Sequence, residues 1–116
     1  MRALVIFLLL LGAGRTLAAE ESADRQVAFG LKVAQKGLWQ EARFRFERAT
    51  QLEPSNASAL NNLAVALEQM GEFAEARQAY EKALSLKPGD IYIQQNYDLF
   101  READDKRNRK SRRRRP

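Results

Sequence analysis

The fold of this chain is decided by the stretch Trp39-Gln40-Glu41-Ala42-Arg43-Phe44-Arg45-Phe46-Glu47-Arg48-Ala49, because a related stretch follows from Phe73 to Ala83. One constant offset relates the two stretches and their surroundings, in the pairs Gly37/Gly71, Trp39/Phe73, Ala42/Ala76, Phe46/Tyr80, Ala49/Ala83 and Pro54/Pro88. Self-similarity at such a period predicts a stack of two-helix units. Proteins of this kind usually bind other molecules and seldom act as catalysts.

The apolar residues of the second repeat have helical spacing. They form two stripes, first Leu60, Leu63, Ala64 and Leu67, and then Phe73, Ala76, Tyr80 and Ala83. Gly71 lies between the stripes, where a left-handed glycine can end a helix at little steric cost. Ser55 and Asn56 are good N-caps for the first of these helices. Pro88-Gly89-Asp90 repeats this punctuation, so a fifth helix is expected over residues 91–104.

Small residues mark the places where helices should meet. Ala42 and Ala76 stand where the two helices of one hairpin are expected to cross closely, and Ala49 and Ala83 allow the same approach to the next unit. Alternation of large and small side chains lets antiparallel helices interlock with few voids.

These residues together resemble the tetratricopeptide repeat (TPR) family. The second repeat, 57–90, supplies Leu60, Leu63, Ala64, Leu67, Gly71, Phe73, Ala76, Tyr80, Ala83 and Pro88. The first, 23–56, supplies Phe29, Gly30, Val33, Gly37, Trp39, Ala42, Phe46, Ala49 and Pro54, and departs from the pattern at Gln26. The resemblance implies an all-α fold, a right-handed stack of about five helices in a TPR domain over 19–104. It consists of two 34-residue repeats and a capping helix at 91–104.

The resemblance also implies which residues face a neighbouring unit. The relevant positions hold Arg25 and Lys32 in the first repeat, Ala59 and Ala66 in the second, and Ile93 and Phe100 in the fifth helix. The charged pair suits a face without a neighbour, whereas the other pairs can be buried. The far side of the fifth helix is polar, with Gln94, Asp98 and Arg101. Both ends of the stack are therefore expected to be solvated, as terminal repeats require.

In this family the first helix of each unit lines an inner groove, so the resemblance implies a binding site for another protein or peptide. The residues expected there are Val27, Leu31, Asn61, Asn62, Val65, Asn96 and Leu99. Asn62 and Asn96 occupy equivalent positions, and their carboxamides could hold an extended peptide backbone or could bond neighbouring helices. The clamp by which some TPR domains grip a chaperone's terminal carboxylate is not matched. Its positions hold Val27, Leu31, Asn62, Tyr92 and Asn96, without a cation.

Residues 1–18 have the order of a secretory signal peptide. A positive start at Met1-Arg2 precedes an apolar run from Ala3 to Leu11, and Thr16-Leu17-Ala18 supplies small residues. The run is too short to cross a bilayer, which takes roughly 20 residues. We expect cleavage after Ala18 or Ala19 and an exported protein, periplasmic or secreted. The alternatives are a buried N-terminal core helix and an uncleaved membrane anchor.

The net charge of +5 divides into an acidic body and a basic tail. Residues 20–105 hold 10 Lys and Arg against 15 Asp and Glu, whereas residues 106–116 hold eight cations and no acid. The cations are Lys106, Arg107, Arg109, Lys110, Arg112, Arg113, Arg114 and Arg115. Such a charge run predicts disorder over 105–116. The tail could aid solubility, bind an anionic membrane surface, bind nucleic acid, be a processing site at Arg112 to Arg115, or fold against the acidic body. Nucleic acid fits poorly with export.

The amino-acid composition argues against catalysis. The chain has no His and no Cys, which removes the usual general base, the thiolate nucleophile and the commonest metal ligands. No nucleophile elbow or phosphate-binding glycine loop is present. We therefore expect no catalytic residue, no metal and no cofactor. The expected function is that of an exported TPR adaptor, which could also self-associate weakly. The alternative is that the tail binds an anionic surface and the stack is a structural unit.

Overall fold

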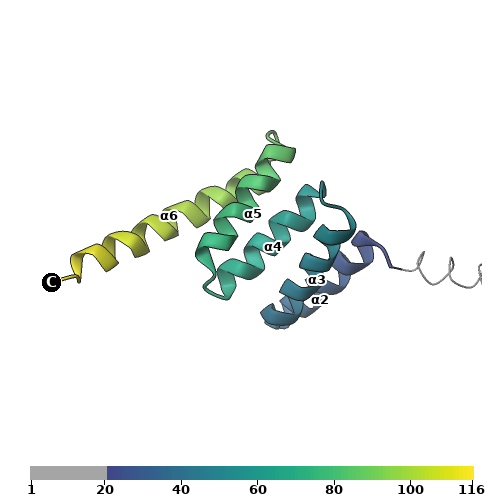
Figure 1. Cartoon of the computed structure of the whole chain (residues 1–116), viewed down its shortest axis with the longest axis horizontal. Coiled ribbons are helices and arrows are strands. Elements are labelled where there is room, and N and C mark those ends of the chain that lie inside the picture. The colour runs from purple at the N-terminus through teal and green to yellow at the C-terminus, as the bar shows by residue number, and fades with distance from the viewer. Residues whose placement is uncertain (1–20) are drawn as a thin grey trace, which may run out of the picture.

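The computed structural model describes residues 21–116, and all regular structure in this part of the chain is α-helical. The helices are α2 (Ala23–Gln35), α3 (Trp39–Leu52), α4 (Ala57–Gln69), α5 (Phe73–Leu86) and α6 (Ile91–Arg113) (Figure 1). The predicted all-α fold is confirmed. The two helix pairs fall within the two repeats that the constant offset in the sequence defines.

Helix ends follow the local signals in the sequence. The Asn56 side chain accepts a hydrogen bond of 2.9 Å from the backbone N–H of Ala59 and caps α4, as predicted. Gly37 and Gly71 have φ angles of 74° and 78°, which L side chains rarely adopt. After each glycine the next N–H reaches back to a carbonyl five residues earlier, so that both helices end in the same hydrogen-bonded turn.

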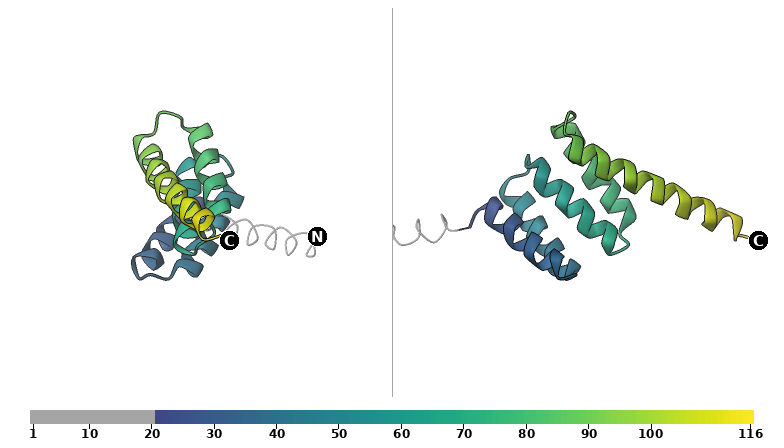
Figure 2. Two further views of the ribbon diagram at one scale, coloured as in Figure 1. Left: turned by 90° about the vertical axis from the view of Figure 1, so that its left-hand side faces the viewer. Right: turned by 180° about the vertical axis from the view of Figure 1, so that it is seen from behind.

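The helices pack in two layers. One layer holds α2, α4 and α6, and the other holds α3 and α5. Each helix contacts the next one along the chain, and α4 also contacts both α2 and α6 (Figures 1 and 2). On α6, the last helix of the stack, Gln94, Asp98 and Arg101 are all exposed, as predicted.

The close helix crossings predicted from small residues are confirmed. Ala42 and Ala76 are fully buried. Ala59 packs with Ala49, and Ala66 packs with Ala42 and Phe46, so the second unit meets the first through alanines. Side chains this small bring the helices close together and leave little empty volume between them.

Aromatic residues dominate the contact between α5 and α6. The Tyr80 ring lies 5.4 Å from Phe100 and 5.9 Å from Tyr97 between ring centroids. Ile93 is buried with Leu60 and Ala83 near the start of α6. The predicted packing of the fifth helix on the second repeat is confirmed.

The predicted end of the fifth helix at residue 104 is wrong, and of the predicted disorder over 105–116 the part over 105–113 is wrong. Helix α6 continues to Arg113 as a basic helical extension (105–113). The repeat itself explains this, because the position equivalent to Gly37 and Gly71 holds Asp105, which does not end a helix. Ion pairs spaced three and four residues apart, such as Glu102–Lys106 at 3.0 Å, support the extra turns. Cations in the last turn also suit the helix dipole.

The predicted signal peptide, residues 1–18, lies outside the described residues. Within residues 21–116, none of the helices combines the length and the apolar character needed to cross a membrane.

Candidate peptide-binding face

The predicted groove residues lie on the layer formed by α2, α4 and α6. We call the side of this layer turned away from α3 and α5 the inner face. Leu31 on α2 is 44% exposed and Leu99 on α6 is 67% exposed. The central helix α4 contributes Asn61, Asn62 and Val65, which are half-buried. The inner face thus combines exposed apolar side chains at its edges with sheltered carboxamides at its centre.

The structure distinguishes the two asparagines that the repeat makes equivalent. The Asn96 side chain donates a hydrogen bond of 3.2 Å to the Asn61 carboxamide oxygen, so it joins α6 to α4. The side chain of Asn62 has no hydrogen-bond partner within residues 21–116. For Asn96 the interpretation as a bond between neighbouring helices is therefore correct. Asn62 keeps a donor and an acceptor available on a half-buried side chain.

The two valines of the predicted site belong mainly to the core. Val27 packs against two buried clusters, one around Ala49 and Ala59 and one around Phe46. Val65 packs against the cluster that contains Tyr80 and Phe100. Leu31 and Leu99 are the apolar members of the predicted set that a ligand can cover without disturbing the core.

A charged cluster fixes the extension of α6 to α5. Arg77 on α5 donates a hydrogen bond of 2.7 Å to the carboxylate of Asp104, and Arg107 donates to the same carboxylate at 3.2 Å. The Arg107 guanidinium lies 3.5 Å from the centroid of the Phe73 ring, a cation–π contact. These hydrogen bonds, that from Arg77 first, hold the pKa of the Asp104 carboxyl below its ordinary value.

Sequence reasoning missed this cluster. Its signal was present, since Asp104 and Arg107 are three residues apart on a stretch without Gly or Pro. The partner Arg77 lies on another helix, and only the packing of α5 against α6 brings the two side chains together.

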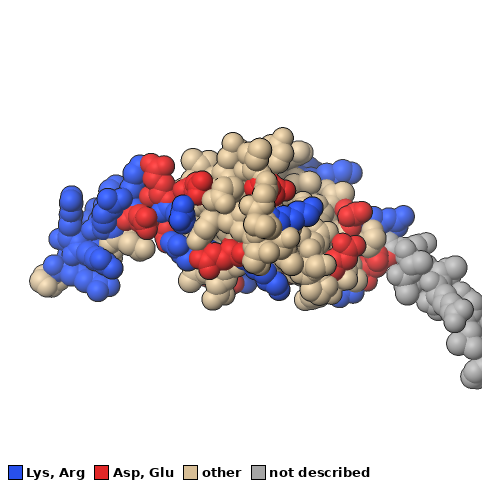
Figure 3. All heavy atoms as spheres, turned by 90° about the horizontal axis from the view of Figure 1, so that it is seen from above, with Lys and Arg blue, Asp and Glu red and all other residues tan. Residues whose placement is uncertain are grey.

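Except for Arg107, which lies over Phe73 of α5, the cations of the extension lie beyond the two-layer stack. Figure 3 shows Lys and Arg gathered at the end of α6, whereas acidic and basic residues are mixed over the stack itself. Lys106 pairs with Glu102 at 3.0 Å and Arg107 with Asp104. Lys110 and Arg113 have no carboxylate partner in the described part of the chain. Their charges are available to a ligand.

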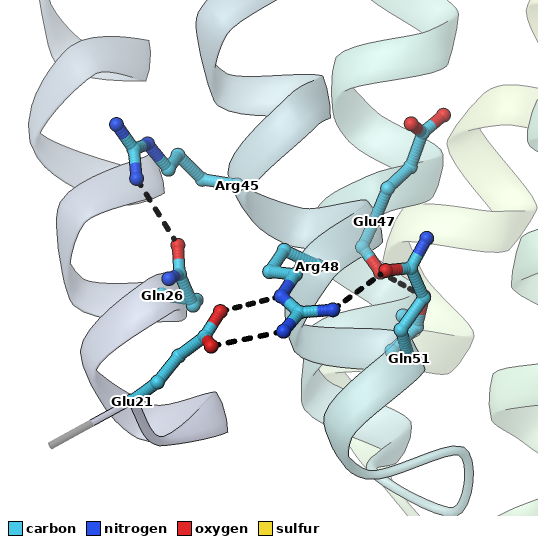
Figure 4. Close-up of polar contacts among 7 residues, drawn as sticks. Glu21, Gln26, Arg45, Glu47, Arg48 and Gln51 are labelled. Atoms are coloured by element: carbon cyan, nitrogen blue, oxygen red, sulfur yellow. Dashed lines mark hydrogen bonds and ion pairs between the residues drawn. The ribbon is translucent and has the colours of Figure 1, made fainter. Parts of the chain in front are cut away.

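The opposite end of the stack is held by another arginine. Both carboxylate oxygens of Glu21 accept from Arg48, whose guanidinium lies between Glu21 and Gln51 (Figure 4). Gln26, which departs from the repeat pattern, accepts a hydrogen bond of 3.5 Å from Arg45. A polar side chain is tolerated there because α3 supplies a donor for it.

An apolar hollow lies outside the inner face. It has a volume of about 700 Å³ and is lined by Leu38, Trp39, Gln40, Glu41 and Phe44. Leu38 is 52% and Phe44 57% exposed. Residues 21–116 contain no group of three or more side chains that could hold a metal ion.

Comparison with known proteins assigns the fold. The sequence matches the family described as "Tetratricopeptide repeat" over residues 57–90 and that described as "TPR repeat" over residues 30–71. The chain belongs to the tetratricopeptide repeat family. The two TPR matches together span more than half of the 116 residues and cover α3, α4 and α5 entirely.

Solved structures agree with this assignment. The TPR domain of Sgt2 from Aspergillus fumigatus matches with a TM-score of 0.71 and 19% identity, covering 76% of this chain and 60% of that one. MamA matches with a TM-score of 0.67 and 32% identity, covering 76% of this chain and 48% of that one. This chain thus spans less than two thirds of the length of either protein. No curated protein matches the sequence.

A TPR structure with a bound peptide is among the matches. The second TPR domain of human RPAP3, solved in complex with an HSP70 peptide, has a TM-score of 0.67 and 22% identity. The match covers 76% of this chain and 74% of that one. At this identity the likeness concerns the fold. A TPR fold is a protein–protein interaction module, and the family is generally one of non-enzymatic scaffolds.

Proposed function

We propose that this TPR protein is a non-enzymatic adaptor that binds an extended peptide or a helix of another protein on its inner face. One observation carries the proposal: the inner face presents both the exposed side chains of Leu31 and Leu99 and the Asn62 carboxamide, which has no hydrogen-bond partner within the described residues. A peptide backbone both donates and accepts hydrogen bonds, as the Asn62 carboxamide does. Peptide side chains would cover the exposed leucines and remove their apolar surface from water.

We also propose that residues 1–18 direct export and are then removed. The order of charge, apolar run and small residues supports this. Mass spectrometry of the protein isolated from its native source tests it. A mature chain that begins at Ala19 or Glu20 is expected, and an intact N-terminus would contradict the proposal.

Peptides selected from a random display library against the full chain test the binding site. We expect the selected peptides to bind a Leu99→Gln variant about tenfold more weakly, because a covered leucine contributes roughly 1.5 kcal/mol. Asn62→Ala should weaken binding as well, since a bound backbone would lose a donor and an acceptor.

Ile91→Gln is the matched control. Ile91 is on the same helix and is also 67% exposed, but it lies about 80° around the helix axis from Leu99. Its substitution should leave the affinity unchanged. The proposal is wrong if Leu99→Gln and Ile91→Gln bind the selected peptides equally well, or if selection yields no binder.

A further inference from the structure

The face of α6 that carries Leu99 continues into the basic extension. Residues spaced by four and three positions share one side of a helix, so Lys106, Lys110 and Arg113 follow Leu99 along a single stripe. Tyr92, which is 78% exposed, lies on the same side of the helix, about two turns before Leu99. We call Lys106, Lys110 and Arg113 the basic stripe. The apolar edge of the inner face and the cationic end of the molecule are thus parts of one surface.

The spacing along this surface is fixed by the helix. Lys110 lies about 16 Å and Arg113 about 21 Å from Leu99 along the axis, at about 1.5 Å per residue. An extended chain advances about 3.3 Å per residue. A bound segment that follows α6 would therefore reach these two cations about five and six residues away from the residue on Leu99.

The stripe is held in position by the rest of the molecule. Asp104, the residue just before the extension, accepts a hydrogen bond of 2.7 Å from Arg77 of α5, and Arg107 stacks on Phe73. Among the described residues, Asp104 is the only charged residue that is buried. Since the first turn of the extension is tied to α5 at these points, its cations keep a defined direction relative to Leu99.

We propose that the partner of the inner face is an extended, acidic protein segment, with an apolar side chain on Leu99 and carboxylates beside Lys110 and Arg113. This rests on the proposed function and names the chemistry of the ligand. Lys110 and Arg113 have no carboxylate partner within residues 21–116, so a ligand can supply one. Lys106 is already paired with Glu102 and contributes less.

Two other anionic partners, a membrane surface and nucleic acid, fit the stripe less well. A helix that lies in a bilayer surface needs an apolar face, and residues 105–115 contain no apolar side chain. Nucleic acid is attracted by cations on every side of the helix and has no need of an exposed leucine beside them. An acidic segment with an apolar residue uses both Leu99 and the basic stripe.

Two synthetic peptides of equal composition test the register. The probe peptide has a central leucine with glutamates five and six positions away on both sides, so that either chain direction can bind. The control peptide has the glutamates next to the leucine, and serine and glycine fill both. Fluorescence anisotropy with the full chain at low ionic strength should show tighter binding of the probe peptide. Equal affinities for the two peptides would overturn the register.

Two double variants test the stripe. Lys110→Gln/Arg113→Gln should weaken binding of the probe peptide about fivefold, the effect of losing two exposed ion pairs. Arg109→Gln/Arg112→Gln removes the same charge from exposed positions of the same helix that lie off the stripe, and should change binding less than twofold. Equal losses in both variants would mean attraction by net charge alone and would overturn the proposal, as would no loss in either.

Further comparisons between variants and ligands separate this proposal from the proposed function. If Lys110→Gln/Arg113→Gln binds like the wild type while Leu99→Gln does not bind, the acidic ligand is wrong and the inner-face site stands. If Leu99→Gln also binds like the wild type, both are wrong. Phosphatidylserine vesicles and a short DNA duplex are tested in parallel. Tighter binding of either one than of the probe peptide, with equal loss in the two double variants, would overturn the acidic-segment proposal.

Discussion

Arg77 on α5 donates a hydrogen bond of 2.7 Å to the carboxylate of Asp104 on α6. The two residues are 27 positions apart, and their contact joins the last helix of the stack to the helix before it. On its other side the carboxylate accepts from Arg107, which lies over the Phe73 ring. The extension of α6 is therefore supported by tertiary contacts as well as by its own helical hydrogen bonds.

Asp104→Asn should destabilise the protein and shorten α6. The amide cannot replace a charged acceptor shared by two guanidinium groups, and the expected loss is about 1 kcal/mol in the free energy of unfolding. Thermal unfolding followed by circular dichroism measures it. Asp98→Asn is the control, because Asp98 pairs with Arg101 at an exposed site of the same helix. Equal effects of the two variants would contradict a special role for Asp104.

The difference in stability between the wild type and Asp104→Asn should depend on pH. The bond from Arg77 lowers the pKa of Asp104 in the folded state below its ordinary value of 3.8. A group with a lowered folded-state pKa stabilises the fold fully above its unfolded pKa, and the stabilisation is lost as the pH falls through the folded pKa. Melting temperatures of the two proteins should therefore converge below about pH 3.8. A constant difference from neutral pH to pH 2 would show that the carboxylate charge is not responsible.

Asp105→Gly should reduce the helicity of the extension. Gly at this position restores the residue that ends α2 and α4 in the repeats, and a helix-interior Gly costs about 1 kcal/mol relative to Ala. Backbone chemical shifts of residues 106–113 measure the helical population. Asp105→Ala removes the same carboxylate and should keep the helix. If both variants lose helicity to the same extent, loss of the charge and not the backbone freedom of glycine is the cause.

The sequence was sufficient for the repeated part of the fold. The pairs at a constant offset predicted the helix-ending glycines and the closely packed alanines, and the resemblance to TPR repeats predicted the packing of Ile93 and Phe100. These features are local or recur in both units, so one repeat explains the other. The predicted end of α6 was wrong. A dense run of cations is typical of disorder, but Asp105 replaces the helix-ending glycine of the two repeats, so that α6 continues. The Arg77–Asp104 contact joins residues 27 positions apart and depends on how α5 packs against α6, which no local pattern encodes.

The candidate site was predictable only in outline. The resemblance to the TPR family implied that Leu31, Asn62 and Leu99 share one layer, and the structure leaves them exposed or half-buried. The sequence could not reveal that Asn96 is bonded to Asn61, because that bond depends on the distance between α4 and α6. The alignment of the basic stripe with Leu99 was also missed, since it requires α6 to continue past residue 104.

Gly30→Ala should destabilise the first repeat. A Cβ atom at Gly30 would lie 2.5 Å from Cε1 of Phe46, whose side chain is buried. Overpacking of this kind costs about 1–3 kcal/mol and should exceed the gain in helix propensity of about 1 kcal/mol. Chemical denaturation measures the net loss. In a double-mutant cycle with Phe46→Leu, the penalty of the alanine should shrink, because the ring that it meets is gone. Additive effects would contradict the steric explanation.

The site itself is tested most directly by mapping amide chemical-shift changes on the isotope-labelled full chain during titration with a selected peptide. The largest changes are expected at Leu31, Asn62 and Leu99, with smaller ones at Lys110 and Arg113. Changes confined to Leu38, Trp39 and Phe44 would place the ligand in the hollow on α3 and would contradict binding on the inner face.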